Sequence, residues 1–264
     1  MADDTVLLVG CGNMGRAMLT GWLAARPSLE AHVVEPSAAL REAAEAAGAK
    51  AVASPADLPS ALSPDLVFLA VKPQVMPDVL PDYAGFEGAT FVSIAAGTTV
   101  ATLRAGLGGA APIVRCMPNT PAAIGAGMMV CYATDGVAEG ARALAEALLA
   151  ASGEVAWIED EGSMDAVTAV SGSGPAYVFH LIETLAAAGA EVGLPADLAA
   201  RLALQTVMGA GRLAAESGTD AAELRRQVTS PGGTTAAALG VLKRENGLQP
   251  WMTEAVTAAR DRGR

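Results

Sequence analysis

Short apolar runs separated by helical patterns fill the first 160 residues, and no run of this kind follows them. Each run is apolar throughout instead of alternating with polar residues, which is typical of strands covered by helices on both faces of a sheet. Strands that alternate with helices form parallel sheets. We therefore predict an α/β domain with a doubly wound sheet in residues 1–160. The runs lie at 5–10, 32–35, 65–71, 90–95, 111–117, 127–133 and 154–158.

Residues 161–264 carry helical patterns only, and we predict an all-helical second domain there. The segment 195–217 places apolar residues on more than one face, which is more than a helix packed on one side needs. A second subunit would cover the surplus, so we expect a homodimer or a dimer-based higher oligomer. The expected helices lie at 174–192, 195–217, 233–245 and 248–261.

Charge and hydropathy exclude two classes of partner. The chain has a net charge of −11, and Lys and Arg never occur more than two together, so the basic surface of a protein that binds nucleic acid or anionic membranes is missing. No uninterrupted apolar stretch reaches the roughly 18 residues that span a bilayer. The acidic start MADDTVLLVG lacks the pattern of a signal peptide. We expect a cytoplasmic protein with no nucleic-acid and no membrane partner.

The cysteines and histidines argue against disulfides and metal sites. There are three Cys and two His. The odd number of cysteines, without CxxC spacing, favours reduced thiols. His32 and His180 lie far apart, without Cys or carboxylates at ligand spacing. We therefore expect no metal.

A glycine-rich turn, GCGNMG, follows the first strand and opens a helix. Gly10, Gly12 and Gly15, with Asn13 and Met14 between them, form the pattern that brings backbone amides close to the pyrophosphate of a dinucleotide. The alternative is a tight turn that binds nothing. Strand, helix and a later carboxylate all stand at the expected places, so we predict a Rossmann-type domain that binds NADH or NADPH.

Glu35 ends the second strand, 20 residues after Gly15. A carboxylate there accepts hydrogen bonds from the ribose hydroxyls and repels a 2′-phosphate, which favours NADH over NADPH. The alternative is that Ser37 and Arg41 line a phosphate pocket while Glu35 turns away. The segment Glu35, Pro36 and Ser37 is expected to contact the cofactor in both cases.

Three further strands end in small residues, prolines and isolated polar groups. Ligands of doubly wound sheets bind outside the carboxyl ends of the strands, so we expect these ends to hold the nicotinamide and its ribose. Lys72 is either a ligand or an ordinary exposed lysine, and Asn119 either orients the carboxamide or forms a turn. The predicted contacts are Ala70, Val71, Lys72, Pro73, Ala95, Ala96, Gly97, Met117, Pro118 and Asn119.

The segment SPGGTT leads directly into a predicted helix and forms a second candidate anion site. Its amides near Gly232, Gly233 and Thr234, with the Ser230 hydroxyl, suit a carboxylate or phosphate, and Thr235 would face the same space. The alternative is a capped helix start. The run SGSGP at 171–175 opens another helix and marks either ligand contact or close packing of the backbone.

The motifs GCGNMG, AVKPQ, SIAAG, RCMPNTP, SGSGPAYVF and TSPGGTT, in this order, resemble the pyrroline-5-carboxylate reductase family over nearly the whole chain. The resemblance implies a Rossmann domain, a helical dimerisation domain in which two chains interlock, and reduction of 1-pyrroline-5-carboxylate to L-proline. It implies that Thr235 bonds the substrate nitrogen, that Ser230 with residues 232–234 binds the carboxylate, and that Glu161 lies near the substrate.

The resemblance also places Asp57 beside the adenosine, where the family often has Asn. At the position of Glu35 the family often has Ser, Thr or Asn.

Two other functions remain as alternatives. A β-hydroxyacid dehydrogenase would need a lysine general base in the SGSGPAYVF helix, which has none. A regulatory protein that binds NAD(H) without turnover would leave the cofactor unoxidised.

Overall fold

The computed structural model describes residues 4–263 and divides them into two compact units. The first unit extends to Gly172 and includes Gly263, and the second comprises Ser173–Arg262. The sequence predicts a domain boundary between residues 160 and 161. The division into compact units does not test this boundary, which stays a prediction.

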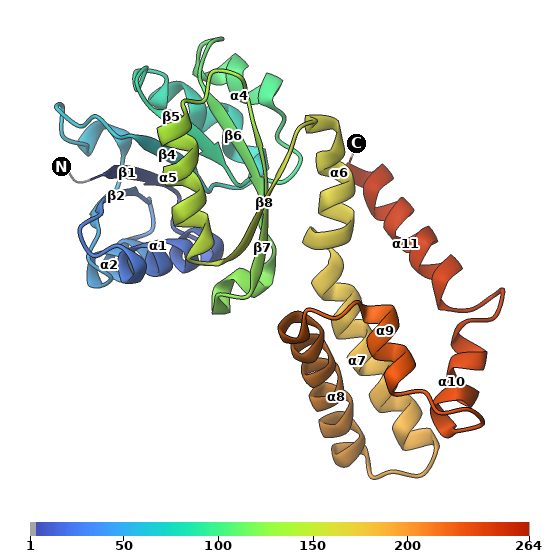
Figure 1. The fold of residues 1–264 in the computed structure, drawn as a ribbon. Coiled ribbons are helices and arrows are strands. Elements are labelled where there is room, and N and C mark those ends of the chain that lie inside the picture. Colours follow the sequence, from blue (N-terminus) through green and yellow to red (C-terminus); the bar gives the residue numbers. More distant parts are fainter. Residues whose placement is uncertain (1–3, 264) are drawn as a thin grey trace. The chain divides into compact units, whose positions relative to one another are not determined.

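The first unit contains an eight-stranded sheet in the order β3-β2-β1-β4-β5-β6-β7-β8 (Figure 1). All neighbouring strands are parallel except β6 and β7. This mostly parallel arrangement confirms the predicted α/β class. The strands are β1 (Thr5–Val9), β2 (Glu30–Val34), β3 (Lys50–Val52), β4 (Leu66–Leu69), β5 (Thr90–Ser93), β6 (Ile113–Met117), β7 (Gly127–Ala133) and β8 (Gly153–Ile158).

Helices cover both faces of the sheet, which explains why its strands are apolar throughout. On one face, Val6 and Leu8 of β1 pack in a cluster with Trp22. On the other, Leu7 and Val9 pack in a cluster with residues that include Leu103. The helices of this unit are α1 (Asn13–Ala25), α2 (Ala38–Ala46), α3 (Met76–Val79), α4 (Val100–Leu107), α5 (Glu139–Ala150) and α6 (Met164–Val167).

Two features of the sheet were not predicted. Strand β3 has only three residues and pairs with β2 alone, so its sequence carries little pattern. Strand β7 runs antiparallel to β6. Only residues 118–126, with the short turn η4 (Thr120–Ile124), separate these strands. A parallel crossover needs a dozen or more residues, so this connection allows only an antiparallel return.

The second unit is helical, as predicted. The structure adds α9, whose seven residues follow Asp220; the Asp220 carboxylate accepts hydrogen bonds from the amides of Ala222 and Glu223. The helices are α7 (Gly174–Glu191), α8 (Ala196–Ser217), α9 (Ala221–Gln227), α10 (Thr234–Leu242) and α11 (Leu248–Gly263, of which Gly263 belongs to the first unit).

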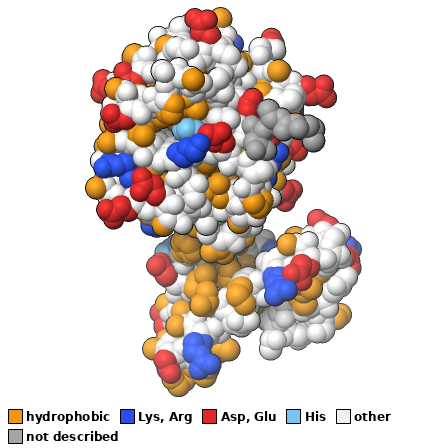
Figure 2. Space-filling model, turned by 90° about the vertical axis from the view of Figure 1, so that its left-hand side faces the viewer, with side chains coloured by type: hydrophobic (Ala, Val, Ile, Leu, Met, Phe, Trp, Pro, Cys, Tyr) orange, Lys and Arg blue, Asp and Glu red, His pale blue; other side chains and the backbone are white. Residues whose placement is uncertain are grey.

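Hydrophobic side chains are exposed over the helices of the second unit (Figure 2). Phe179 of α7 is 59% exposed, and Met208 of α8 is 54% exposed. A lone subunit thus leaves more apolar surface uncovered than a monomer normally does. Within residues 4–263, no helix has the length and apolar character needed to cross a membrane.

Candidate active site

The glycine-rich turn between β1 and α1 leaves room for a ligand only at its centre. Gly10 has a φ of 87°, and a Cβ there would lie 3.1 Å from the Ala70 oxygen. A Cβ on Gly15 would lie 2.5 Å from the Gly10 oxygen. Around Gly12, in contrast, an added Cβ would meet nothing within 4 Å. Two glycines therefore allow close packing of the backbone, and the third keeps the approach to the helix open.

The N-terminus of α1 suits an anion. Gly12 is the residue that precedes the helix, and no side chain caps the first amides. Free N–H groups at a helix start attract negative charge and bind phosphate groups. The residues of the turn therefore fit the pyrophosphate of a dinucleotide.

Glu35 lies directly after β2 and is only 8% exposed. Its Oε2 accepts a hydrogen bond from the Cys11 amide at 2.7 Å, and its Oε1 accepts one from the Ser37 amide at 2.9 Å. Arg41 donates to the Glu35 and Pro36 carbonyls at 2.9 and 2.7 Å. The carboxylate thus ties the glycine-rich turn to the start of α2, a role that the sequence did not reveal.

A groove of about 530 Å³ opens at the carboxyl ends of β1, β2 and β4. Predicted cofactor contacts line it: Gly10, Gly12, Glu35, Pro36, Ala70, Val71 and Lys72. Sequence reasoning missed other lining residues, because they lie in turns and short helical segments after β3 and β4 that carry no motif: Ala53, Pro55, Val75, Val79, Asp82 and Tyr83. Burial, with the nearby Asp82 charge, raises the pKa of Tyr83, which keeps its hydroxyl neutral.

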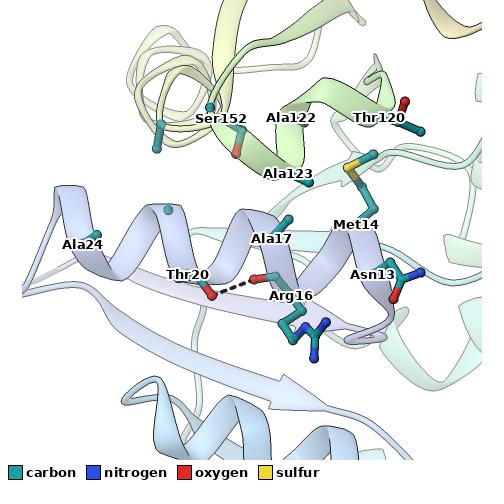
Figure 3. A pocket seen from close by; sticks show the side chains of 13 residues that line it. Asn13, Met14, Arg16, Ala17, Thr20, Ala24, Thr120, Ala122, Ala123 and Ser152 are labelled. Carbon is teal, nitrogen blue, oxygen red and sulfur yellow. Dashed lines mark hydrogen bonds between the residues drawn. The ribbon is translucent and has the colours of Figure 1, made fainter. Parts of the chain in front are cut away.

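Other predicted contacts are not among the residues that line this groove. Pro73 begins the turn η2 (Pro73–Val75), Ser37 precedes α2, and Asp57 is an exposed residue of the turn η1 (Pro55–Asp57). Asn13 and Met14 begin α1 and line a second groove of about 700 Å³, between α1, η4 and the turn before β8 (Figure 3).

The loops after β5 and β6 contain the contacts expected for the nicotinamide. Gly97, with a φ of 71°, has open space where a Cβ would stand. The Asn119 side chain is used within the protein. Its Nδ2 donates to the carbonyl and hydroxyl of Ser171, both at 3.3 Å, and its Oδ1 accepts from the Met128 amide at 2.9 Å. Ser171 of the SGSGP run thus joins the end of β6, and the carboxamide contact of Asn119 stays a prediction.

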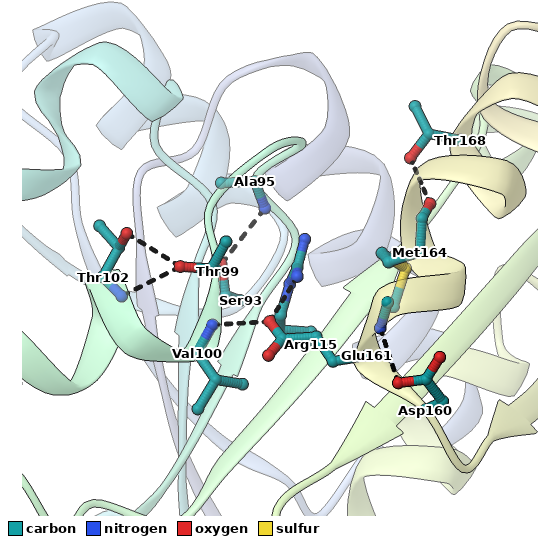
Figure 4. Close-up of polar contacts among 11 residues, drawn as sticks. Ser93, Ala95, Thr99, Val100, Thr102, Arg115, Asp160, Glu161, Met164 and Thr168 are labelled. Carbon is teal, nitrogen blue, oxygen red and sulfur yellow. Dashed lines mark hydrogen bonds and ion pairs between the residues drawn. The ribbon is translucent and has the colours of Figure 1, made fainter. Parts of the chain in front are cut away.

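Glu161 begins the turn η5 (Glu161–Ser163) that follows β8. Its Oε1 accepts hydrogen bonds from Arg115 Nη1 at 2.5 Å and from the Val100 amide at 2.7 Å (Figure 4). The Arg115 side chain is 7% exposed and that of Glu161 is 29% exposed. Sequence reasoning missed Arg115, since nothing local indicates a partner 46 residues away.

The SPGGTT segment forms the N-terminus of α10 in the second unit. Gly232 has a φ of 71°, and Gly233 precedes the helix without a side-chain cap. The Gly233 amide donates to the Ser230 carbonyl at 3.1 Å, which closes the turn. Thr234 and Thr235 are the first two helical residues. Anion binding by this uncapped helix start stays a prediction.

The described part of the chain contains no group of three or more His, Cys, Asp or Glu side chains placed to hold a metal ion. Cys11, Cys116 and Cys131 are buried free thiols. Burial raises the pKa of the Cys11 thiol, and the charge of Glu35 adds to this effect.

Comparisons with known proteins cover both units. A family model described as pyrroline-5-carboxylate reductase dimerisation matches residues 161–264, and one described as NADP oxidoreductase, coenzyme F420-dependent, matches residues 5–97. The chain is 40% identical over 266 residues to a pyrroline-5-carboxylate reductase of Pseudomonas aeruginosa, covering 99% of this chain and 96% of the relative.

Solved structures agree over the same length. A pyrroline-5-carboxylate reductase from Coxiella burnetii superimposes with a TM-score of 0.91 at 34% identity, covering 99% of this chain and 98% of that one. The Plasmodium falciparum enzyme with NADP bound has a TM-score of 0.81 at 28% identity, covering 100% and 98%. The chain therefore belongs to the pyrroline-5-carboxylate reductase family of NAD(P)H-dependent oxidoreductases.

Proposed function

We propose that this chain reduces 1-pyrroline-5-carboxylate to L-proline. The observation that carries the proposal is the uncapped N-terminus of α10, where the amides of Gly232 and Thr234 flank Gly233, whose own amide donates to the Ser230 carbonyl. A helix start of this kind binds a carboxylate without a cationic side chain. The substrate of the family carries such a carboxylate beside its cyclic C=N bond.

The residues of the chain position the substrate more than they activate it. A bound NAD(P)H supplies the hydride that adds to the imine carbon. Thr235 is the second residue of α10, next to Thr234, and we assign its hydroxyl the hydrogen bond to the ring nitrogen. A protonated imine is already electrophilic, so alignment and this single bond are sufficient, and no strong acid is needed.

Glu161 is a second residue that we assign to the substrate, following the family resemblance. Its Oε1 is held by Arg115 and by the Val100 amide. Its Oε2 makes no hydrogen bond within residues 4–263, and the side chain is partly exposed. We assign this oxygen to the substrate.

We further propose that NADH is preferred over NADPH. The support is the Glu35 carboxylate, which is held by two backbone amides beside the glycine-rich turn. A negative charge fixed there repels a 2′-phosphate. Arg41, the cation that could offset it, already donates to two backbone carbonyls.

The active form is proposed to be a homodimer or a dimer-based oligomer in the cytoplasm. The match of residues 161–264 to a dimerisation model and the exposed apolar side chains of α7 and α8 support the assembly. Interlocked helices of two chains would cover this surface.

Thr235→Ala tests the assignment of the nitrogen-side bond. We expect kcat/KM with 1-pyrroline-5-carboxylate to fall about 10- to 100-fold, which corresponds to losing one hydrogen bond of roughly 1.4–3 kcal/mol. Folding and cofactor affinity should be unchanged, because Ala is tolerated in a first helical turn.

Thr235→Ser is the matched control, since it keeps the hydroxyl, and it should retain much more activity. If Thr235→Ala keeps the wild-type kcat/KM while Ser230→Ala abolishes it, Thr235 is only part of the helix start. If the wild-type chain binds NADH but never oxidises it with this substrate, the proposed reaction is wrong.

A further inference from the structure

Arg115 is the one buried Lys or Arg among residues 4–263. It lies in β6 between Ser93 of β5 and Tyr132 of β7, its neighbours across the sheet. Burial of an unpaired guanidinium costs several kcal/mol, so such groups persist only with good partners. An apolar residue at this position of β6 would avoid that cost. The presence of a paired Arg115 therefore indicates a specific role for the pair.

The partner, Glu161, uses one oxygen atom to join three segments. Its Oε1 accepts from Arg115 in β6 and from the amide of Val100, the first residue of α4 (Figure 4). Glu161 itself begins η5, which directly follows β8. A carboxylate at a helix N-terminus is also favoured by the helix dipole. Strand β6, helix α4 and the segment after β8 are thus held at one point.

Two of these segments bear the loops expected to contact the nicotinamide. Residues 94–99 connect β5 to α4, and residues 117–119 lie at the end of β6. The first loop is held at both ends, because Ser93 Oγ accepts from the Ala95 amide at 3.4 Å and Thr99 Oγ1 accepts from the Thr102 amide at 3.1 Å (Figure 4). Through Glu161, Arg115 of β6 is linked to Val100, which directly follows this loop.

We infer that Arg115 is a positioning residue for hydride transfer: through Glu161 it fixes the loops 94–99 and 117–119 relative to each other, and so fixes the nicotinamide ring between them. The inference rests on the proposed function for the identity of the ring. It assigns Arg115 no contact with substrate or cofactor. The glycine-rich turn and Glu35, which serve the rest of the dinucleotide, are independent of the pair.

Arg115→Met tests the inference, since it keeps the bulk of the side chain and removes the charge and the hydrogen bond. We expect the Kd for NADH to stay within about threefold, because the pyrophosphate and adenosine contacts are intact. We expect kcat to fall about tenfold or more, because a misplaced ring loses alignment with the imine. The primary isotope effect with NADH deuterated at the transferred position should increase.

Two variants distinguish positioning from a loss of folding. Arg26→Met is the matched control: it breaks the pair of Arg26 with Asp4, 2.6 Å apart, next to the amino end of β1, whereas the two loops lie at the carboxyl ends of β5 and β6. It should leave kcat and the isotope effect unchanged. Arg115→Lys retains a cation and should recover part of kcat. If Arg115→Met does not fold, Glu161→Gln, which keeps an oxygen acceptor for Val100, should reduce the nicotinamide emission of bound NADH, a readout without substrate and therefore independent of the contact assigned to Glu161 Oε2.

A second readout needs no substrate. The nicotinamide emission of NADH in the binary complex reports how rigidly the ring is held. We expect the wild-type chain to enhance this emission and Arg115→Met to lose the enhancement. The inference is overturned if Arg115→Met keeps the wild-type emission, kcat and isotope effect, or if Arg26→Met changes them equally. If the wild-type chain fails to reduce 1-pyrroline-5-carboxylate, the proposed reaction fails, while the emission still decides the role of Arg115.

Discussion

Glu35→Gln separates the two roles that the structure gives to Glu35. The carboxylate accepts one backbone amide on each oxygen, from Cys11 and from Ser37. Glutamine keeps one acceptor, but its amino group faces the other N–H, which then has no partner. An unpaired buried N–H costs about 1–3 kcal/mol, and the remaining bond loses its charge, worth roughly another 1 kcal/mol.

The expected loss of stability is thus about 3 kcal/mol, which lowers Tm by roughly 6–12 °C for a chain of this size.

The preference for NADH over NADPH should change as well. Repulsion between one carboxylate and a nearby 2′-phosphate contributes roughly 1–2 kcal/mol at the effective dielectric constant of a site close to the protein surface. The ratio of kcat/KM for NADH to that for NADPH should therefore fall about 5- to 30-fold.

The assays are thermal unfolding and steady-state kinetics with both cofactors. Glu42→Gln is the control, because Glu42 is an exposed residue of α2 and the variant makes the same change in charge. It should alter neither Tm nor the cofactor ratio. An unchanged ratio in Glu35→Gln, or a wild-type chain with tenfold higher kcat/KM for NADPH, would refute the proposed preference.

Two other predictions concern the glycine-rich turn and the assembly. Gly15→Ala should weaken NADH binding at least about tenfold, because the new Cβ would lie 2.5 Å from the Gly10 oxygen and must displace the turn. Gly140→Ala, where a Cβ meets nothing within 4 Å, is the control. Equal NADH affinities of the two variants in a titration would contradict the reasoning. Sedimentation should show a dimer or larger species at micromolar concentration, since the apolar surface of α7 and α8 needs a partner. A stable, active monomer of 26.4 kDa would exclude the proposed assembly.

Local patterns were sufficient to predict most of the architecture. The strands of the first unit are apolar on both faces because helices cover them, and that pattern is visible in single segments such as 5–10. The glycine-rich turn before α1 and the N-terminus of α10 could be predicted for the same reason, because the spacing of glycines is a local feature of the sequence. Strand β3 was missed because three residues at the edge of a sheet carry too little pattern.

Long-range polar contacts could not be predicted in this way. Arg115 and Glu161 are 46 residues apart, and Asn119 bonds Ser171 across 52 residues. Glu35 was expected to face a ribose, yet both of its oxygens also hold backbone amides, one of them 24 residues away. The partner of a buried polar group depends on the packing of whole elements, which neither periodicity nor motif spacing describes.

A crystal structure of the chain with NAD⁺ and L-proline bound would test the assigned site most directly. The account predicts the proline carboxylate at the α10 N-terminus, on the amides of Gly232 and Thr234, the ring nitrogen within hydrogen-bonding distance of Thr235 Oγ1, and the nicotinamide between the loops 94–99 and 117–119. A carboxylate bound elsewhere, with the α10 N-terminus free, would contradict it.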